Sequence, residues 1–257
     1  MGKIYTVVNQ KGGVGKTTTS INLGAYLGQF GQKVLLIDLD PQANATSCLG
    51  IDRHKVETGI YEVLIGARNA ADCILHNPRF KISLIPSSPN LSGAEIEMID
   101  LPDRERRLES IIKTLVSHYD YILIDCPPSL GLLTVNALTA ADTLLAPIQC
   151  EYYALEGLSD LMNTVKLVRT HLNPMLDVEG VVLTMFDART NLSEQVVLEV
   201  KKFFKNKVYR TIIPRSIRLG EAPSFGLPIN QYDPRCVGAK AYQALAEEVI
   251  ANDGGKA

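Results

Sequence analysis

The stretch NQKGGVGKTT, residues 9–18, lies between a short apolar run and a helical pattern. A phosphate-binding loop has a glycine, four further residues, and then Gly-Lys-Ser or Gly-Lys-Thr. The end of that pattern is present at residues 15–17, but Gln10 stands where the first glycine belongs, and a second lysine, Lys11, follows it. The stretch therefore predicts a nucleotide-binding α/β protein whose loop carries one lysine more than the pattern needs.

The glycines of this loop allow backbone N–H groups to approach phosphates closely, and the helix that follows presents its positive end to them. We expect Lys16 to neutralise the β- and γ-phosphates and Thr17 to hold Mg²⁺ through its hydroxyl. The predicted nucleotide-binding residues of the loop are Lys11, Gly12, Gly13, Val14, Gly15, Lys16, Thr17 and Thr18.

Short apolar runs recur along the chain, at residues 4–8, 34–38, 82–86, 121–125, 143–148, 181–186 and 208–214. They are continuous rather than alternating, which is typical of parallel strands buried on both faces. Helical patterns lie at residues 18–30, 104–119, 155–172, 193–204 and 239–251. We predict an α/β fold of the phosphate-loop NTPase type: one doubly wound, mostly parallel, twisted sheet of about seven to eight strands, with helices on both faces. Residues 1–257 are expected to form a single domain with a frayed tail at 252–257.

Ligands of such sheets bind beyond the carboxyl ends of the strands, where three acids are found. Asp38 ends one apolar run and Asp40 lies two residues further, so both point to one face and suit contact with metal-bound water and orientation of water. Asp125 ends another run and is expected to reach Mg²⁺ through a water. The predicted metal set is Thr17, Asp38 and Asp125, although aspartates that only cap loops would give the same pattern. Pro214 ends the last run, where a nucleoside base is expected.

Composition excludes several other classes of protein. None of the four histidines falls at these strand ends, so the chemistry implied is nucleoside triphosphate hydrolysis by positioning, Mg²⁺ and charge. Five dispersed cysteines without a Cys-x-x-Cys pair argue against a disulfide framework or a zinc site and favour a reducing compartment. No signal peptide and no apolar stretch of roughly 18 residues is visible, so we expect a cytoplasmic protein without a membrane span.

Four segments, KGGVGKTT, LLIDLDPQANAT, YILIDCPPSLGLLTVNAL and PIQCEYYALEGL, resemble the ParA chromosome-partitioning ATPases, which carry a deviant phosphate loop, and in particular their Soj branch. The resemblance extends from Lys3 to about Val249, and the later segments TMFDARTNLSEQV, YRTIIPRSIRLGEAPSFGLPI and YDPRCVGAKAY match the same branch.

The resemblance implies roles for individual residues. Lys16 would be the ordinary phosphate lysine, whereas Lys11 would cross a dimer interface to the nucleotide of the partner. Asp40 would orient the attacking water, and Asp125 would be the second acid of the nucleotide site. Lys11, Lys16 and Asp40 are therefore the predicted catalytic residues. ATP with Mg²⁺ would lie between two subunits of an ATP-dependent homodimer that binds double-stranded DNA without sequence preference. Hydrolysis stimulated by a ParB-type centromere-binding partner would release the dimer from the nucleoid, and so move or position chromosome or plasmid origins.

A basic run follows residue 200. Seven basic residues and no acid lie in residues 201–218 of a chain whose net charge is −2. A solvated helix face is one interpretation, and phosphate-backbone binding is the other. The resemblance favours the second, because Arg189 and Arg218 match arginines with which the Soj branch grips DNA. The predicted DNA-binding residues are Arg189, Lys201, Lys202, Lys205, Arg215 and Arg218.

Three alternatives stay open at this point. A MinD-like ATPase positions other cargo at the membrane through a basic amphipathic C-terminal helix, whereas this chain ends in ANDGGKA. A redox ATPase of the nitrogenase iron-protein type needs cysteine ligands for a shared cluster, and Cys126 has no convincing companion. A non-catalytic ATP-sensing protein would retain the loop without turnover.

Overall fold

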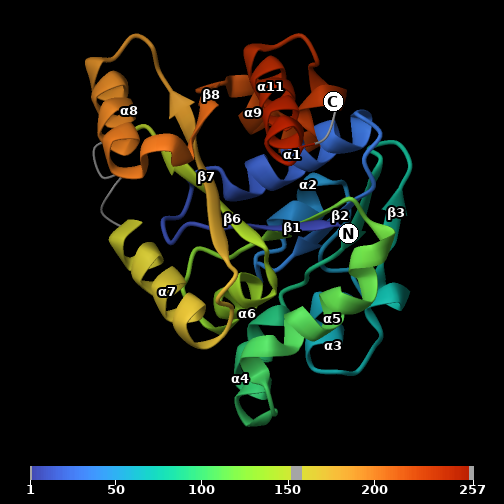
Figure 1. Ribbon diagram of the computed structural model, residues 1–257. Coiled ribbons are helices and arrows are strands. Elements are labelled where there is room, and N and C mark those ends of the chain that lie inside the picture. The colour runs from blue at the N-terminus through green and yellow to red at the C-terminus, as the bar shows by residue number, and fades with distance from the viewer. Residues whose placement is uncertain (1, 152–157, 255–257) are drawn as a thin grey trace.

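The computed structural model describes residues 2–151 and 158–254 and contains one sheet of eight strands (Figure 1). The strands are β1 (Lys3–Val7), β2 (Val34–Asp38), β3 (Leu75–Asn77), β4 (Ile82–Ile85), β5 (Tyr121–Asp125), β6 (Thr143–Gln149), β7 (Asp177–Phe186) and β8 (Val208–Pro214). Their order in the sheet is β3-β4-β2-β5-β1-β6-β7-β8. All neighbours pair in parallel except β3 and β4. The predicted mostly parallel, doubly wound sheet is confirmed.

Helices cover both faces of this sheet. They are α1 (Lys16–Gln29), α2 (Asn44–Cys48), α3 (Ile60–Leu64), α4 (Leu91–Glu97), α5 (Arg107–Leu115), α6 (Leu132–Ala140), α7 (Leu158–His171), α8 (Asn191–Phe204), α9 (Ile217–Glu221), α10 (Ile229–Tyr232) and α11 (Val237–Asn252). In Figure 1, α1 and α11 lie on one side of the strands, and α5, α6 and α7 lie on the other. The first residues of the helix expected at 155–172 lie outside the described residues.

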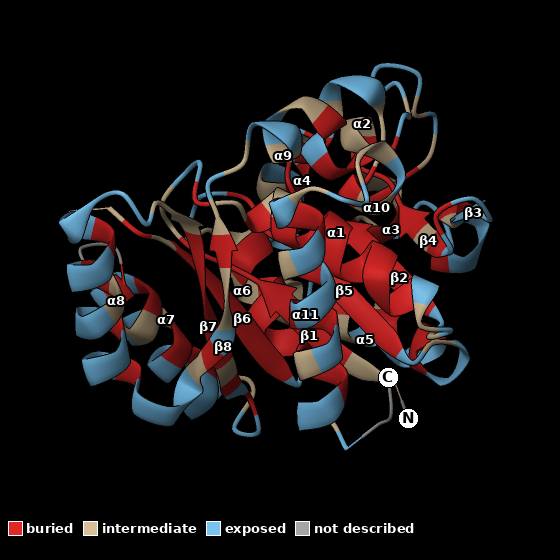
Figure 2. Cartoon of the chain, turned by 90° about the horizontal axis from the view of Figure 1, so that it is seen from above, coloured by how far each residue is buried: buried red, intermediate tan, exposed pale blue. Residues whose placement is uncertain are grey.

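The central strands β1, β2, β5 and β6 are buried on both faces, and alternate residues feed two separate cores. In β2, for example, Leu35 and Ile37 join the core under α5 and α6, whereas Val34 and Leu36 join the core under α1 and α11. Figure 2 shows the central strands buried and the outer faces of the helices exposed. This division explains why the apolar runs are continuous in the sequence.

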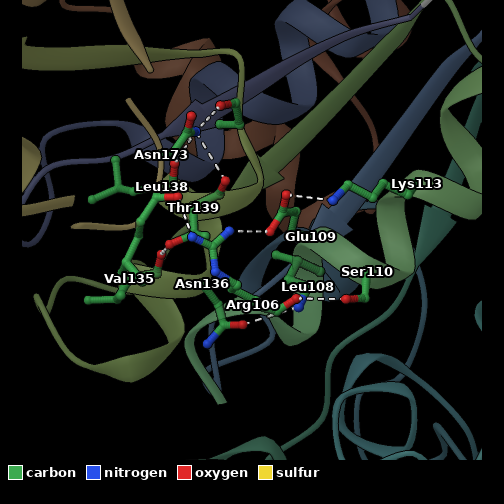
Figure 3. A network of polar contacts seen from close by, with 12 residues as sticks. Arg106, Leu108, Glu109, Ser110, Lys113, Val135, Asn136, Leu138, Thr139 and Asn173 are labelled. Atoms are coloured by element: carbon green, nitrogen blue, oxygen red, sulfur yellow. Dashed lines mark hydrogen bonds and ion pairs between the residues drawn. The ribbon is translucent and has the colours of Figure 1, made fainter. Parts of the chain in front are cut away.

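A polar network fixes α5 and α6 relative to each other (Figure 3). The amide nitrogen of buried Asn136 donates to the carbonyl oxygen of Arg104 at 2.8 Å, and its oxygen accepts from the backbone N–H of Leu108 at 3.1 Å. Asn173 donates to three carbonyl oxygens around the end of α6, including that of Ala141 at 2.7 Å. The backbone N–H of Leu108 at the start of α5 and the carbonyl groups at the end of α6 therefore have hydrogen-bond partners outside their own helices.

The structure differs from the sequence prediction in two places. Strand β3 was not predicted, because it has three residues, pairs antiparallel at the sheet edge and includes no buried side chain. The tail at 252–257 was predicted to fray, and this is wrong for its first residues: Asn252 ends α11, and the Asp253 carboxylate accepts hydrogen bonds from Lys3 and from the Tyr5 hydroxyl. Residues 255–257 lie outside the described part of the chain.

Candidate functional site

The carboxyl ends of three adjacent strands bring the predicted acids and the glycine-rich loop together. In the sheet register, Val7 at the end of β1 and Asp38 at the end of β2 both lie beside Asp125 at the end of β5. The glycine-rich loop continues directly from β1, and Asp40 follows Asp38 by two residues. The predicted acids and the glycine-rich loop therefore lie together at the carboxyl ends of β1, β2 and β5.

The glycine-rich loop curves around its own lysine. Gly13 and Gly15 have φ values of 73° and 92°, in the left-handed region that favours glycine. Lys16 begins α1, is only 7% exposed, and donates from its Nζ to the carbonyl oxygen of Lys11 at 3.1 Å. Burial lowers the pKa of Lys16, and the nearby Asp125 carboxylate acts in the opposite direction. The loop thus holds a cation at the amino end of a helix, which suits an anionic phosphate.

Lys11 has a different environment from Lys16. Its backbone N–H donates to Oδ1 of Asn9 at 3.0 Å, and its carbonyl accepts from Lys16, so its main chain is fixed. Its side chain is partly exposed and makes no hydrogen bond or ion pair with residues 2–151 or 158–254. The ammonium group is therefore available to a group outside this chain.

Asp125 has one carboxylate oxygen bound and one without a partner. Its Oδ1 accepts from the Ser20 hydroxyl at 2.8 Å, whereas its buried Oδ2 has no hydrogen bond within the described residues. Burial raises the pKa of Asp125 to about 7, with a further rise from Asp38 and an opposing effect of the nearby Thr17 and Ser20 hydroxyls. Ser20 was not among the predicted site residues; it lies four residues after Lys16 and so on the same face of α1.

Asp38 is engaged by the loop that follows it. Its Oδ2 accepts from the backbone N–H of Thr46 at 2.8 Å and from the Thr46 hydroxyl at 2.7 Å, and its Oδ1 accepts from the backbone N–H of Asp40 at 3.2 Å. Burial raises the pKa of Asp38 to about 6. Asp38 thus organises the segment that carries Asp40, and it offers a metal less than its position in the sequence suggests.

Asp40 is buried in the same segment, two residues after the end of β2. It is 5% exposed, its Oδ1 accepts from the backbone N–H of Gln42 at 2.9 Å, and its carbonyl accepts from the Ser87 hydroxyl at 2.8 Å. Ala43, in the left-handed region at φ 50°, then starts α2. The carboxylate is held beside the phosphate loop by contacts on both sides of the turn.

These residues fit Mg²⁺ that is held jointly with a nucleotide. Within residues 2–151 and 158–254 no group of three or more His, Cys, Asp or Glu side chains could hold a metal alone. Mg²⁺ characteristically uses one or two protein ligands together with phosphate oxygens and waters. Thr17 and the unpartnered oxygen of Asp125 supply that small set.

A cavity of about 200 Å³ lies beside the loop. Gly15 and Thr18 line it on one side, and Pro214 at the end of β8 lines it on the other. Val14 connects the two sides, because its carbonyl accepts from the Thr184 hydroxyl of β7 at 2.8 Å. Met185, which has a φ of 53°, also lines the cavity. Pro214 is therefore placed next to the phosphate loop, where a base could lie.

The basic run at 201–218 is divided between the amino ends and the carboxyl ends of the strands, so it does not form one patch. Helix α8 leads from the carboxyl end of β7 back to the start of β8, over 14 residues, or about 21 Å. Lys201 and Lys202 lie in the last turn of α8 and Lys205 follows it, so most of the helix, shown in Figure 1, separates them from Arg189. Arg215 follows β8, so it lies at the edge that holds the phosphate loop.

The three predicted DNA-binding arginines form ion pairs. Arg189 contacts Asp187 at 2.6 Å, Arg215 contacts Glu151 at 3.2 Å, and Arg218 contacts Glu221 at 2.8 Å and Asp233 at 3.5 Å. The arginine side chains are 85%, 54% and 54% exposed, respectively. Ion pairs this exposed contribute little free energy, so a phosphate can replace the carboxylate.

The protons that Asp38 and Asp125 keep in the folded state predict that the nucleotide-free protein becomes less stable as the pH rises. The pKa values of Asp125 and Asp38 rise from 3.8 to about 7 and about 6, so the folded protein keeps protons that the unfolded chain has released. The free energy of unfolding should fall between about pH 4 and about pH 7, because the unfolded state binds fewer protons there. Urea unfolding without Mg²⁺ measures this fall. It should be shallower in Asp125→Asn, and equal slopes in both proteins would contradict the assignment.

Comparisons with known proteins show the family of this chain. Residues 2–178 match the family model described as an AAA domain. The sporulation initiation inhibitor protein Soj of Bacillus subtilis is 58% identical over 252 residues, which cover 98% of this chain and 100% of that protein. The chain belongs to the ParA/Soj family. The chromosome partitioning protein ParA of Myxococcus xanthus is 50% identical, with 98% of this chain and 89% of that protein covered. The chromosome-partitioning ATPase Soj of Treponema pallidum is also 50% identical, and 99% of each chain is covered.

A solved structure shows the same architecture in a further protein. Cobyrinic acid a,c-diamide synthase from Mycobacterium smegmatis, with bound ADP and magnesium, has a TM-score of 0.88 and 35% identity, covering 99% of this chain and 96% of that one. The same protein has also been solved with an ATP analogue and magnesium, at 34% identity. ParA/Soj-type sequences and this amide-forming enzyme thus share one fold.

Two features bear on the alternatives to a ParA/Soj ATPase. The Cys126 thiol is fully buried against the Thr6 hydroxyl at 3.1 Å, and burial raises the pKa of Cys126 to about 12. A buried, protonated thiol is not placed for an iron–sulfur cluster shared between two subunits. No helix within residues 2–151 and 158–254 has the length and apolar character needed to cross a membrane.

Proposed function

We propose that this ParA/Soj-family chain is a Mg²⁺-dependent ATPase that moves or positions chromosome or plasmid origins. ATP binding forms a sandwich homodimer that binds double-stranded DNA without sequence preference. Hydrolysis, stimulated by a ParB-type centromere-binding protein, returns the subunits to the monomer and releases them. The protein would then work in the cytoplasm, on the nucleoid.

The observation that carries the proposal is the unequal environment of two lysines in one loop. Lys16 is buried and held at the start of α1, whereas the Lys11 side chain is partly exposed and forms no hydrogen bond or ion pair within the described residues. A loop that serves only the nucleotide of its own subunit needs a single lysine, at the position of Lys16. Lys11 is therefore assigned to the nucleotide of the partner subunit.

The remaining residues supply positioning and charge. Backbone N–H groups of residues 12–17 and the Lys16 ammonium stabilise the charge of the transferring phosphoryl group. Thr17 and Asp125 hold Mg²⁺, which neutralises phosphate oxygens when it is bound. Asp40 orients the attacking water. Support comes from the solved relative that binds an ATP analogue with magnesium and from the relatives named as ATPases.

Binding to DNA is assigned first to the arginines at the nucleotide edge. Arg189, Arg215 and Arg218 are exposed, and the carboxylates that pair with them are between 20% and 45% exposed. Dimerisation places two copies of each arginine on one particle, which raises the number of phosphate contacts without new residues. The lysines at the far end of α8, Lys201, Lys202 and Lys205, form a second and more distant group.

Replacing Arg189 or Arg218 by alanine should weaken ATP-dependent DNA binding. Each dimer loses two phosphate contacts, so the slope of log affinity against log salt concentration should become shallower by about 2. Filter binding across a salt series measures this slope. Arg104→Ala removes an arginine of comparable exposure elsewhere and should leave the slope unchanged. Wild-type slopes in both arginine variants would show that these arginines do not bind DNA. A shallower slope in Lys201→Ala/Lys202→Ala alone would assign DNA binding to the lysines at the end of α8.

A further inference from the structure

A second and larger cavity, of about 830 Å³, lies at the amino ends of β2, β4 and β5, at the other end of these strands from the phosphate loop. Its walls come from the end of α1 at Gly28, the start of β2 at Val34 and the end of α5 at Leu115. Because α1 begins at the phosphate loop and has 14 residues, about 21 Å separates the two sites. Volumes of this size hold small organic molecules.

The charged and imidazole side chains around this cavity are all basic. Lys33, His76, Lys81 and His118 line it, and no Asp or Glu does. The chain as a whole has 28 acids against 26 lysines and arginines, so this is a local reversal of sign. The Asp120 carboxylate, next to the cavity residue Tyr119, lies near this rim but is already engaged by the main chain, since its Oδ2 accepts from the backbone N–H of Lys33 at 2.8 Å. Within the described residues neither Lys33 nor Lys81 forms an ion pair.

The cavity also has an apolar wall. Val34 and Leu115 are buried at its base, Ile74 packs against the core, and the Tyr119 ring lies beside them. The combination of an apolar base and a basic rim fits a ligand that has one apolar part and one anionic part.

Lys81 is held in a strained conformation at the rim. Its φ is 56°, in the left-handed region that a lysine rarely adopts. The backbone there packs so closely on α1 that a Cβ added to Gly28 would lie 2.4 Å from the Lys81 carbonyl oxygen. Glycine or asparagine would fit this position with less strain. A lysine kept under strain at the edge of a cavity points to a use for its side chain.

His76 is oriented by its neighbour across the β3–β4 pair. His76 and Ser83 lie opposite each other in the register, and Nδ1 of His76 is 2.9 Å from the Ser83 hydroxyl. Where the hydroxyl donates to Nδ1, the proton of the ring lies on Nε2. That N–H is then a further donor for an anion at the same rim.

We propose that this cavity binds a small amphipathic anion, in which a flat apolar body rests on Val34, Ile74 and Leu115 and a carboxylate, phosphate or sulfonate group contacts Lys33, Lys81 and His76. The site is distinct from the nucleotide site and lies at the other end of α1.

The test uses the full chain with its nucleotide site filled by ADP and Mg²⁺. The probe is 1-anilinonaphthalene-8-sulfonate, followed by its fluorescence. The comparison probe is N-phenyl-1-naphthylamine, which has the same rings without the sulfonate, and sodium sulfate tests the anion alone. We expect saturable binding of one sulfonate probe per chain, at least about tenfold weaker binding of the uncharged probe, and competition by sulfate only at much higher concentration.

Two variants locate the site. Lys33→Gln/Lys81→Gln should weaken binding of the sulfonate probe about tenfold, whereas the matched control Lys166→Gln/Lys240→Gln, with the same change of charge on exposed helix positions, should not. Ala71→Trp fills the cavity from its exposed wall and should block the probe without altering either lysine. Urea unfolding confirms that each variant is folded. Equal affinity for the two naphthalene probes, no saturable binding, or binding unchanged in both cavity variants would overturn the proposal.

Discussion

Replacing Lys11 by alanine should abolish ATP-dependent dimerisation while leaving nucleotide binding to the monomer largely intact. The carbonyl of Lys11 that contacts Lys16 is part of the main chain and survives the substitution. The ammonium group is lost, and a two-fold dimer would lose it twice. Removing one partner of a buried charged pair typically costs about 2–5 kcal/mol. The dissociation constant of the dimer should therefore rise by at least about 100-fold. Sedimentation with ATP or a non-hydrolysable analogue measures this.

Two controls separate this effect from damage to the pocket. Lys16→Ala should lose nucleotide binding itself, because the buried ammonium at the start of α1 is removed. Lys11→Arg keeps the positive charge and should retain part of the dimer. Dimers of wild-type strength in Lys11→Ala would show that the lysine serves its own subunit, and the sandwich arrangement would have to be abandoned.

Replacing Asp40 by alanine should trap ATP in a stable dimer. Loss of a group that orients water lowers turnover by about 100-fold or more, whereas the contacts of Lys11, Lys16 and the backbone with ATP persist. The substitution also removes the acceptor for the backbone N–H of Gln42, so Asp40→Asn is the better-matched variant for the turn. Phosphate release and particle size, both measured with ATP and with ADP, give the answer.

The outcome distinguishes three cases. Slow hydrolysis with a persistent dimer supports the role of Asp40. Hydrolysis at the wild-type rate shows that another group orients the water. Loss of ATP binding shows that Asp40 matters for the shape of the loop between β2 and α2 rather than for the reaction. Asp52→Ala, which removes an exposed acid beyond that loop, should behave as wild type.

The sequence was most informative where burial leaves little choice of residue. Strands β2 and β5 have the bounds predicted from their apolar runs, because both faces of each are covered and every residue is buried. The phosphate loop could be predicted because its glycines, lysine and threonine occupy fixed positions. Strand β3 could not, because a short antiparallel edge strand needs neither an apolar run nor alternation.

The sequence was least informative about partners that are distant along the chain. Thr46 binds Asp38 across eight residues, and this changes what Asp38 can offer a metal. The basic run at 201–218 contains no acid, yet Arg215 meets Glu151 and Arg218 meets Asp233. Charge counted along the chain also cannot show that α8 carries Lys201 and Lys202 to the other edge of the sheet.

The hydrogen bond between the Lys16 ammonium and the Lys11 carbonyl couples the two lysines of the loop. An ammonium group has three donors, so Lys16 can keep this carbonyl while it contacts a phosphate. The contact that holds a cation at the start of α1 therefore also fixes the peptide from which the Lys11 side chain extends. In the proposed dimer, the phosphate site of each subunit would then anchor the side chain that reaches the nucleotide of the other.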